Sequence, residues 1–433
     1  MAARAGELPM GPVGAPTTAS SRPLALNPLL LWIAGFASAA VLAISSLRYS
    51  ASKPEMDFQV YRSGGRHIFG SGLYSSQIEV LGRHLLFTYP PVAALLFWPI
   101  SQLSVSAGQV LWNAINLLAL LSLIALSVAA ARSRRLAPSD WRAALMLLTP
   151  MALLLYPVRS DLALGQINLL LVLMILADLT TGLSWRGHSF PHGVLVGLAA
   201  AVKLTPLVFI PYLVVSRQWR AARNATLTFV IATGALCAVS PDASWSYFTK
   251  DAFDVKRVGD SLTIGNQALH AAIIRAHLSP PPMLFGLIEA VVLCGGVAIA
   301  AVAYRRSSRL LAVLVCAATG LMLSPISWLH HYVWIVPALI WLVVGTDRPA
   351  KGAWWALAAA VTFVVVPPTS AGGSGPLWFV RDDAYVLATL VFIALVGVML
   401  WRRLRDGLTS QNEARADLPS TSPRTRRAPL GSR

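Results

Sequence analysis

The chain has 433 residues, of which 56% are hydrophobic and only 12% are charged. Soluble domains carry about 25% charged residues, so this composition excludes a soluble protein and predicts an integral membrane protein. The formal net charge of +17 does not indicate a nucleic-acid partner, because the basic residues lie at the ends of apolar stretches and in the C-terminal tail. Cys237, Cys294 and Cys316 all fall in apolar runs, which indicates small buried side chains and not a disulfide framework.

The two ends of the chain differ from the middle. Residues 1–27 are rich in Ala, Pro, Gly and Ser, which predicts a disordered, cytoplasmic N-terminus. The first apolar stretch follows without a convincing small-residue cleavage site, so we expect an uncleaved anchor. Residues 402–433 are polar and basic, and we expect a disordered cytoplasmic tail there. Residues 28–401 are then one membrane domain.

Apolar stretches recur throughout that domain, and a helix needs about 20 apolar residues to cross the bilayer. Spans are predicted near residues 28–47, 107–131, 143–157, 166–183, 221–240, 283–303, 309–325, 332–346, 353–368 and 383–401. Two further segments are ambiguous. Residues 91–103 are apolar but short, and residues 193–215 carry Lys203 and Pro206 in their middle.

Basic residues orient the spans, because cytoplasmic loops carry the excess of Lys and Arg. They form groups at Arg132, Arg134, Arg135 and Arg142, at Arg217, Arg220 and Arg223, at Arg305, Arg306 and Arg309, and at Arg402, Arg403 and Arg405. All groups are cytoplasmic only if residues 91–103 do not cross and residues 193–215 form a hairpin with Lys203 at its outer tip. This topology has about twelve crossings with both termini inside. Its outer face collects the first loop, the 159–161 turn, Lys203, loop 241–282 and His330-His331.

Asp57 lies in the first outer loop and is followed by Phe58, Gln59, Val60 and Tyr61. A carboxylate at the mouth of a membrane protein tends to mark function, and this one could take a proton from an attacking hydroxyl as a general base. A solvated loop acid or a helix N-cap is the alternative. The segment to Gly70 could form a short interfacial helix, and residues 87–91 would return the chain to the membrane in an extended form.

A polar turn joins the spans that flank residues 156–168. Arg159 could contact a phosphate or a sugar, or could simply pair with Asp161. Gln166 and Asn168 suit hydrogen bonds to sugar hydroxyls.

Lys203 and the adjacent pair His330-His331 are the next candidates. A lysine inside a membrane needs an anion or must snorkel to the interface, and a lipid phosphate is the natural anion. Pro325 breaks a helix just before the histidines. Adjacent histidines on a helix project about 100° apart, and no second ligand cluster with zinc spacing exists, so hydrogen bonds to phosphate or carboxylate fit better than zinc.

The loop from residue 256 to residue 270 adds Arg257, which suits a phosphate, and Asn266 and Gln267, which suit sugar hydroxyls. An amphipathic loop helix that packs on the membrane is the alternative interpretation of this loop.

Six short sequence motifs, taken together and in this order, resemble those of the polyprenol-phosphate-mannose-dependent mannosyltransferases of actinobacteria. These enzymes belong to glycosyltransferase family 87 of the GT-C superfamily. The motifs are Asp57–Tyr61, Phe87–Pro91, Gly165–Asn168, Val202–Pro206, Gly265–Gln267 and Leu323–Trp334. The resemblance covers about residues 28–401 and implies an all-α GT-C bundle of about 10–12 transmembrane helices, with short interfacial helices on the outer face. It implies a sugar donor on polyprenyl phosphate, a glycolipid acceptor such as a phosphatidylinositol mannoside or lipomannan, and an essential aspartate that maps onto Asp57. An α-(1→2) linkage is the commonest assignment.

The resemblance leaves the sugar open, because arabinofuranosyltransferases share the family, although Asp57 without an adjacent second acid favours the mannosyl branch. The expected site has Asp57 as base, Lys203, Arg257, His330 and His331 at the donor phosphate, and Arg62, Tyr89, Arg159, Asp161, Gln166, Asn168, Asn266 and Gln267 at the sugar and acceptor. The expected partners are the polyprenyl-phosphate-sugar donor, the glycolipid acceptor and membrane lipids, with no cofactor and no evident metal site. A lipid or sugar transporter would instead show internal repeats and midplane charges, and the sequence shows no convincing repeat.

Overall fold

The computed structural model describes residues 54–132, 138–182, 184–185, 188–365 and 375–416, with isolated positions between 37 and 48. The expected N-terminal segment 1–27 lies outside the described residues, and so does most of the expected first span. The last helix continues to Ala416, beyond the span end expected at residue 401, and the tail after it also lies outside them.

Helices make up most of the described chain. Two short antiparallel hairpins pair β1 (Ile78–Val80) with β2 (Arg83–Leu85) and β3 (Ser184–Trp185) with β4 (His188–Ser189). The α-helices are α2 (Met56–His67), α3 (Pro91–Ser101), α4 (Val105–Ala131), α5 (Pro138–Leu154), α6 (Tyr156–Leu164), α7 (Asn168–Thr180), α8 (Val194–Val202), α9 (Phe209–Val215), α10 (Trp219–Val239), α11 (Pro241–Thr249), α12 (Leu269–Arg275), α13 (Pro282–Arg306), α14 (Arg309–Leu323), α15 (Ile335–Val344), α16 (Gly352–Val365), α17 (Pro376–Asp382) and α18 (Ala384–Ala416). Short 3₁₀ helices are η1 (Thr205–Val208), η2 (Asp251–Phe253), η3 (Val255–Val258) and η4 (Leu329–Trp334).

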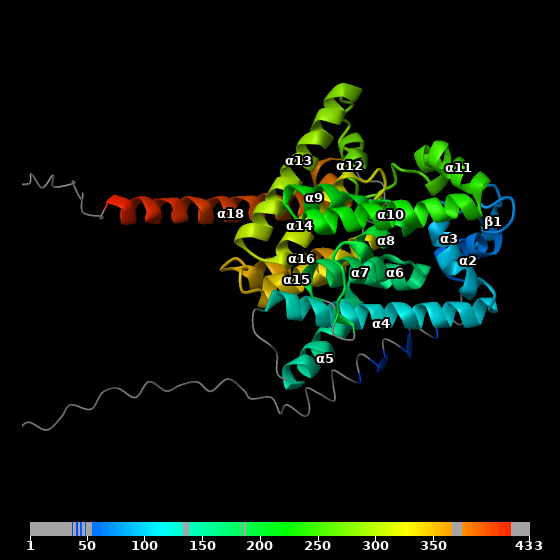
Figure 1. The fold of residues 1–433 in the computed structure, drawn as a ribbon, viewed down its shortest axis with the longest axis horizontal. Helices are drawn as coiled ribbons and strands as arrows, with labels where there is room; N and C mark the ends of the chain where they lie inside the picture. The colour runs from blue at the N-terminus through cyan, green and yellow to red at the C-terminus, as the bar shows by residue number, and fades with distance from the viewer. Residues whose placement is uncertain are drawn as a thin grey trace, which may run out of the picture.

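The protein is an all-α membrane protein. Within the described part of the chain, four helices are long and apolar enough to cross a bilayer, namely α4, α10, α13 and α18. The α5–α6 pair, bent by 77°, makes a fifth if it is one span. Other apolar helices, such as α7 and α14, are shorter, so the expected count of about 10–12 crossings stays a prediction. In Figure 1, α4, α10 and α18 run in nearly the same direction, with α2, α3 and α11 gathered at one end.

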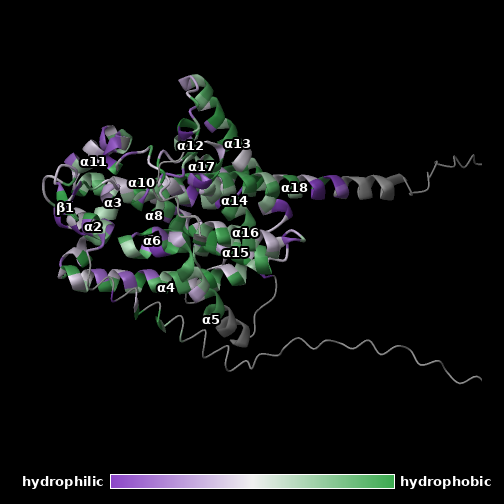
Figure 2. Ribbon diagram, turned by 180° about the vertical axis from the view of Figure 1, so that it is seen from behind, coloured by the Kyte–Doolittle hydropathy of each residue, from purple (hydrophilic) through white to green (hydrophobic). Residues whose placement is uncertain are grey.

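Apolar residues follow this layout. In Figure 2 the hydrophobic colour dominates α13, α14 and α15, whereas hydrophilic residues collect around α11 and in α18 where it leaves the bundle. Close van der Waals packing and hydrogen bonds between neighbouring helices hold such a bundle together, because lipid is as apolar as the outward faces that it contacts.

The segments beside the basic groups meet at one end of the bundle, as the sequence predicts. Hydrogen bonds join them directly. These are Thr346 N to Ala131 O at 3.2 Å, Arg305 Nη2 to Val215 O at 2.6 Å, Arg403 Nη2 to Asp347 O at 2.8 Å and Arg403 Nη1 to Ser307 Oγ at 3.2 Å. The ends of α4, α9 and α13, the Arg403 turn of α18 and the α15–α16 connection therefore lie together, and this part of the bundle is called the basic end below.

The hairpin expected over residues 193–215 is confirmed. A Cβ atom on Gly193 would lie 2.0 Å from Ala221 O, and one on Gly197 would lie 2.3 Å from Ala225 O. The two helices therefore pack in near contact, and α8 runs in the same direction as α10. Helix α9 then returns to the basic end. Lys203 lies at the tip, where the backbone leaves the α region between α8 and η1.

Residues 91–103 contain a single short helix, which agrees with the expectation that they do not cross. Helix α3 has 11 residues and is about 16 Å long, roughly half the thickness of the hydrocarbon core. It packs on α2, where a Cβ atom on Gly65 would lie 2.8 Å from Phe97 O.

Candidate active site

Asp57 lies in the first turn of α2, so the expected short helix after Asp57 is confirmed. A carboxylate is favoured there by the partial positive charge of the helix N-terminus. Buried aromatic side chains anchor α2. The Tyr61 ring stacks on the Phe97 ring of α3, with centroids 4.3 Å apart, and Phe58 is fully buried. The carboxylate therefore projects from a helix that packing holds in place.

The Gln166 side chain connects Asp57 to two tyrosines. Gln166 Nε2 donates to Asp57 Oδ2 at 2.6 Å, while Gln166 Oε1 accepts from the Tyr61 hydroxyl at 2.7 Å. The Tyr89 hydroxyl lies 2.9 Å from that of Tyr61 and 3.4 Å from Gln166 Oε1. The tyrosines accordingly fix which way the amide points, and its donor side faces the carboxylate.

The turn that presents Gln166 is held by the spanning helix α4. Gly165 ends α6 with φ +70°. Its carbonyl accepts from Trp112 Nε1 at 2.8 Å, and the Gln166 carbonyl accepts from Asn116 Nδ2 at 3.0 Å. Because both donors belong to one long helix, α4 fixes the position of the turn.

Replacement of Gly165 with alanine is expected to destabilise the protein by about 2 kcal/mol or more. The left-handed conformation alone costs a residue with a Cβ about 1–2 kcal/mol, and the new Cβ would lie 2.5 Å from Glu55 Oε2 and 2.7 Å from Phe58 Cβ. The unfolding temperature in detergent measures this effect. Gly70→Ala is the matched control, since nothing lies within 4 Å of a Cβ there. Equal unfolding temperatures for the two variants would contradict the role of this turn.

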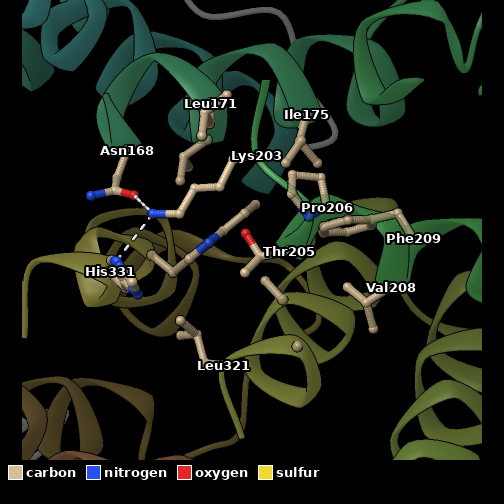
Figure 3. A pocket seen from close by; sticks show the side chains of 14 residues that line it. Asn168, Leu171, Ile175, Lys203, Thr205, Pro206, Val208, Phe209, Leu321 and His331 are labelled. Atoms are coloured by element: carbon tan, nitrogen blue, oxygen red, sulfur yellow. Dashed lines mark hydrogen bonds between the residues drawn. The ribbon is translucent and has the colours of Figure 1, made fainter. Parts of the chain in front are cut away.

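A second set of hydrogen bonds centres on Lys203. Its Nζ lies 2.9 Å from Asn168 Oδ1 and 3.0 Å from His331 Nε2, and Figure 3 shows it reaching from the end of α8 towards both. Asn168 Nδ2 donates to Asp161 Oδ1 at 2.8 Å and lies 3.4 Å from Gln166 Oε1. A lysine ammonium only donates, so His331 Nε2 is the acceptor and carries no proton.

Together these contacts form one continuous network from Asp57 through Gln166 and Asn168 to Lys203 and His331. Four segments far apart in sequence supply it, namely α2, the start of α7, the tip of the 193–215 hairpin and η4. The sequence predicts that these segments share one face, and the structure confirms that they meet.

A small cavity opens beside Lys203, with a volume of about 50 Å³. Asn168, Lys203 and His331 form its polar end. The rest of its wall is mostly apolar and includes Leu171, Ile175, Pro206, Val208, Phe209, Leu321 and Trp334. The polar end suits an anion, and the apolar wall suits a hydrocarbon chain.

The electrostatics of Asp57 favour proton transfer. Burial raises its pKa from 3.8 to about 6, while the Gln166 hydrogen bond and the Lys203 charge offset part of that rise. At neutral pH the carboxylate is ionised and binds a proton more strongly than an exposed one. A base whose pKa lies near the working pH is the most effective general base.

His330 and Asp161 carry buried atoms without a partner among the described residues. The His330 ring stands edge-on to His331, with centroids 4.9 Å apart, and its Nε2 forms no hydrogen bond. Asp161 is fully buried, and its Oδ2 forms none either. Unsatisfied buried polar atoms are rare in folded proteins, so both atoms are candidates for hydrogen bonds to a substrate. Asp161 bonds Asn168, and the ion pairs between described residues do not include Arg159 with Asp161.

Three arginines expected at the site are held elsewhere or point outward. Arg257 forms an ion pair with Asp251 at 3.1 Å and donates to the Tyr74 carbonyl. Arg62 donates to Leu103 O at 2.8 Å. Arg159 is exposed on α6. None of the three joins the Asp57–Lys203 network, so the expected contacts of Arg257, Arg62 and Arg159 with phosphate or sugar stay predictions.

Asn266 and Gln267 also depart from expectation, because both are fully buried and bond the backbone. Asn266 bonds Ser261 O, Pro325 O, Ala268 N and Ser327 N, and Gln267 bonds Ile264 O, Asp382 O, Tyr385 N and Val386 N. Their amides are therefore occupied, and they tie this loop to the segment before η4 and to the start of α18. They act on the site indirectly, by placing the element that carries His331.

Sequence reasoning missed the supports of the site. The sequence does not by itself single out Tyr61 within the segment Asp57–Tyr61, nor the α4 side chains Trp112, Asn113 and Asn116. Asn113 Nδ2 donates to Glu55 Oε1 at 3.0 Å, just before α2 begins. The available signal was two asparagines inside a predominantly apolar span, since such amides need partners. Among the described residues, no three His, Cys, Asp or Glu side chains form a group that could hold a metal.

Comparison with known proteins identifies a family and several relatives of this chain. A model of glycosyltransferase family 87 matches residues 87–325. The chain is 33% identical over 360 residues to the "Polyprenol-phosphate-mannose-dependent alpha-(1-2)-phosphatidylinositol pentamannoside mannosyltransferase" of Mycobacterium tuberculosis, a match that covers 80% of each protein. It is 31% identical over 333 residues to the "Polyprenol-phosphate-mannose-dependent alpha-(1-2)-phosphatidylinositol mannoside mannosyltransferase" of the same species, covering 73% of this chain and 75% of the relative. It is 32% identical over 365 residues to a pentamannoside mannosyltransferase of Mycolicibacterium smegmatis, covering 80% and 84%.

No solved structure matches this chain. The family match extends over more than half of the chain, and the curated relatives align with most of it at about one residue in three identical. The chain belongs to glycosyltransferase family 87.

Proposed function

We propose that this protein moves mannose from polyprenyl-phosphate-mannose to a lipid-linked mannoside acceptor of the phosphatidylinositol mannoside type, with an α-(1→2) linkage. The names of the relatives supply the donor, the acceptor class and the linkage. The observation that carries the proposal is the network that joins one half-buried carboxylate, Asp57, to a cationic cluster at Lys203 and His331. Such a pairing of base and cation suits transfer of a sugar from a phosphate carrier.

The proposed step is a single displacement with inversion, from a β-linked donor to an α-linked product. Asp57 takes the proton of the acceptor hydroxyl as its oxygen attacks the anomeric carbon. Gln166 holds Oδ2 of the carboxylate, so Oδ1 is the oxygen that takes the proton. The bond from the anomeric carbon to the phosphate oxygen breaks, and polyprenyl phosphate leaves with the electron pair. The Lys203 ammonium stabilises the negative charge that builds on that phosphate, with His331 beside it.

We place the site near the extracytoplasmic surface of the cell membrane. Asn116, near the middle of α4, bonds the Gln166 turn, while Ala131 at the end of α4 bonds the basic end. This separation of 15 positions corresponds to about 22 Å along the helix. Because an excess of Lys and Arg marks the cytoplasmic side, the site lies towards the opposite surface, where a lipid-linked sugar can reach it.

Transfer with labelled donors tests the function. Membranes that contain the protein are supplied with labelled polyprenyl-phosphate-mannose and candidate phosphatidylinositol mannosides, and the linkage of the product is determined. We expect mannose transfer that depends on the protein. Transfer only from labelled polyprenyl-phosphate-arabinose, supplied in parallel, would replace mannose with arabinose as the donor sugar. Movement of donor or acceptor across the membrane without a new glycosidic bond would indicate a transporter instead.

The rate of transfer is expected to rise with pH through a half-maximal value near pH 6. Only the ionised Asp57 accepts a proton, and burial has moved its pKa up from 3.8 to about 6. The acid limb therefore lies about two pH units above that of an exposed aspartate. Measurement of kcat/KM between about pH 4 and pH 8 checks this. An acid limb near pH 4 would mean that the functional carboxylate is a solvated one.

A further inference from the structure

A large cavity, separate from the proposed catalytic network, lies between α14, α15, α16 and α18. Its volume is about 600 Å³. The wall is predominantly apolar and aromatic, with Trp341, Phe363, Phe392 and Leu395 among its residues. We call this cavity the α16–α18 groove. Its size and lining suit a hydrocarbon chain, because apolar walls gain little from water.

The mouth of the groove is cationic. Arg348, Arg402 and Arg403 line it, with Asp406 as the single acid among these residues. Arg403 is engaged with Ser307 Oγ and Asp347 O, and these contacts place the mouth at the basic end. Within the described part of the chain, the Arg348 and Arg402 guanidinium groups form no hydrogen bond or ion pair, and both side chains are exposed.

An occupant of this groove must satisfy two demands at once. It must cover an apolar wall that lies inside the bilayer, and it must bring an anion to two arginines at the membrane surface. Basic pockets between transmembrane helices on the cytoplasmic side bind the head groups of anionic lipids. We infer that the α16–α18 groove binds an anionic membrane phospholipid, with its phosphodiester at Arg348 and Arg402 and its acyl chains along α16 and α18.

The polyprenyl phosphate donor is a poorer match for this groove. Its phosphate is proposed to lie at Lys203 and His331, and Lys203 is at the tip of a hairpin whose two helices start and end at the basic end. The groove therefore presents its cations at the end of the molecule opposite to the sugar-transfer site. This inference does not depend on which sugar the protein transfers.

The groove nevertheless touches the catalytic region. Leu321 and Trp334 line both the groove and the small cavity beside Lys203. Tyr332, which also lines the groove, donates from its hydroxyl to the Gln267 carbonyl at 2.6 Å. These residues belong to η4 and the end of α14, which flank His331. A bound phospholipid would therefore pack against η4 from the side that faces the basic end and so support its position.

Lipid retention by the full-length protein tests the inference. The protein is purified in detergent, supplied with phosphatidylglycerol or phosphatidylcholine, and bound lipid is counted by native mass spectrometry across a concentration series. We expect preferential retention of one phosphatidylglycerol. We expect the double variant Arg348→Gln/Arg402→Gln to bind it about 30-fold more weakly, since each cation near a membrane surface contributes about a factor of five. Arg220→Gln is the matched control, because Arg220 is an exposed arginine at the start of α10 that does not line the groove, and it should bind normally.

A second variant tests the apolar part of the groove without changing charge. Ala358 is exposed in the groove wall, and Ala358→Trp should fill the space of an acyl chain and reduce retention at least tenfold, with an unchanged unfolding temperature. Equal retention by wild type, the double arginine variant and Ala358→Trp would overturn the inference. Loss of retention in Arg220→Gln to the same degree would reduce it to non-specific charge attraction. Displacement of the phosphatidylglycerol by equimolar polyprenyl phosphate would assign the groove to the donor carrier instead.

Discussion

Replacement of Asp57 with asparagine is expected to lower kcat/KM for sugar transfer about 10²–10⁴-fold, the usual contribution of a general base. An amide cannot take the proton from the acceptor hydroxyl. The exchange preserves size, and the new side chain can still accept the hydrogen bond from Gln166 Nε2 that now ends on Asp57 Oδ2. Labelled polyprenyl-phosphate-mannose and a phosphatidylinositol mannoside acceptor measure the effect, with the amount of protein in the membrane quantified in parallel.

The Asp57→Asn protein is not expected to be less stable than the wild type at neutral pH. Burial raises the pKa of this carboxyl from 3.8 to about 6, so the folded state binds the proton more strongly than the unfolded state. That preference stabilises the fold at low pH and is lost as pH rises through about 6. At pH 7 the ionised carboxylate is therefore the destabilising form, and the neutral amide removes its desolvation. An unfolding temperature equal to or above that of the wild type checks this.

Asp242→Asn provides the matched control for Asp57→Asn. Asp242 is an exposed acid in the first turn of α11, so the change of charge and helical position are the same. Its transfer rate should stay within about twofold of the wild type, because exposed substitutions away from a site have small effects. Normal transfer by Asp57→Asn, at normal protein level, would remove Asp57 as the base and transfer the role to another acid in the network, such as Asp161.

The placement of segments could be predicted from the sequence because it depends on simple physical rules. The excess of arginines on one side implied a hairpin at residues 193–215, and the structure places Lys203 at its tip. The same rule brought Asp57, Gln166 and His331 to one face. Their side chains then meet because polar groups in an apolar bundle have few other partners.

The partners of individual side chains could not be predicted in the same way. Asn266 and Gln267 look suited to sugar hydroxyls, yet an amide satisfies backbone groups equally well, and here the backbone takes all of their bonds. Arg257 is drawn to Asp251, six positions earlier in the chain. The sequence predicts the segment in which a residue lies. Whether its side chain bonds a ligand or a neighbouring backbone carbonyl depends on distances of a few ångströms, which only the fold determines.

Replacement of Lys203 with methionine is expected to lower kcat about 10²–10³-fold, similar to the loss of one donor that stabilises a developing oxyanion. Methionine keeps the apolar stem but removes the ammonium that now lies 2.9 Å from Asn168 Oδ1 and 3.0 Å from His331 Nε2. Lys250→Met is the matched control, because Lys250 is exposed at the end of α11. It makes the same change of charge outside the network, and it should transfer at the wild-type rate.

The pH profile of the Lys203→Met protein separates two ways in which this lysine could act. Its charge lowers the pKa of Asp57, so without it the acid limb should move to a pH above about 6. If that were the whole effect, transfer would approach the wild-type rate by about pH 7.5, where the carboxylate is largely ionised in both proteins and Lys203 still carries its charge in the wild type. A cation that stabilises the leaving phosphate is missing from the variant throughout this range, so we expect the deficit to persist there. Full recovery there would mean that Lys203 acts only by lowering the pKa of Asp57. Another cation would then have to stabilise the leaving phosphate.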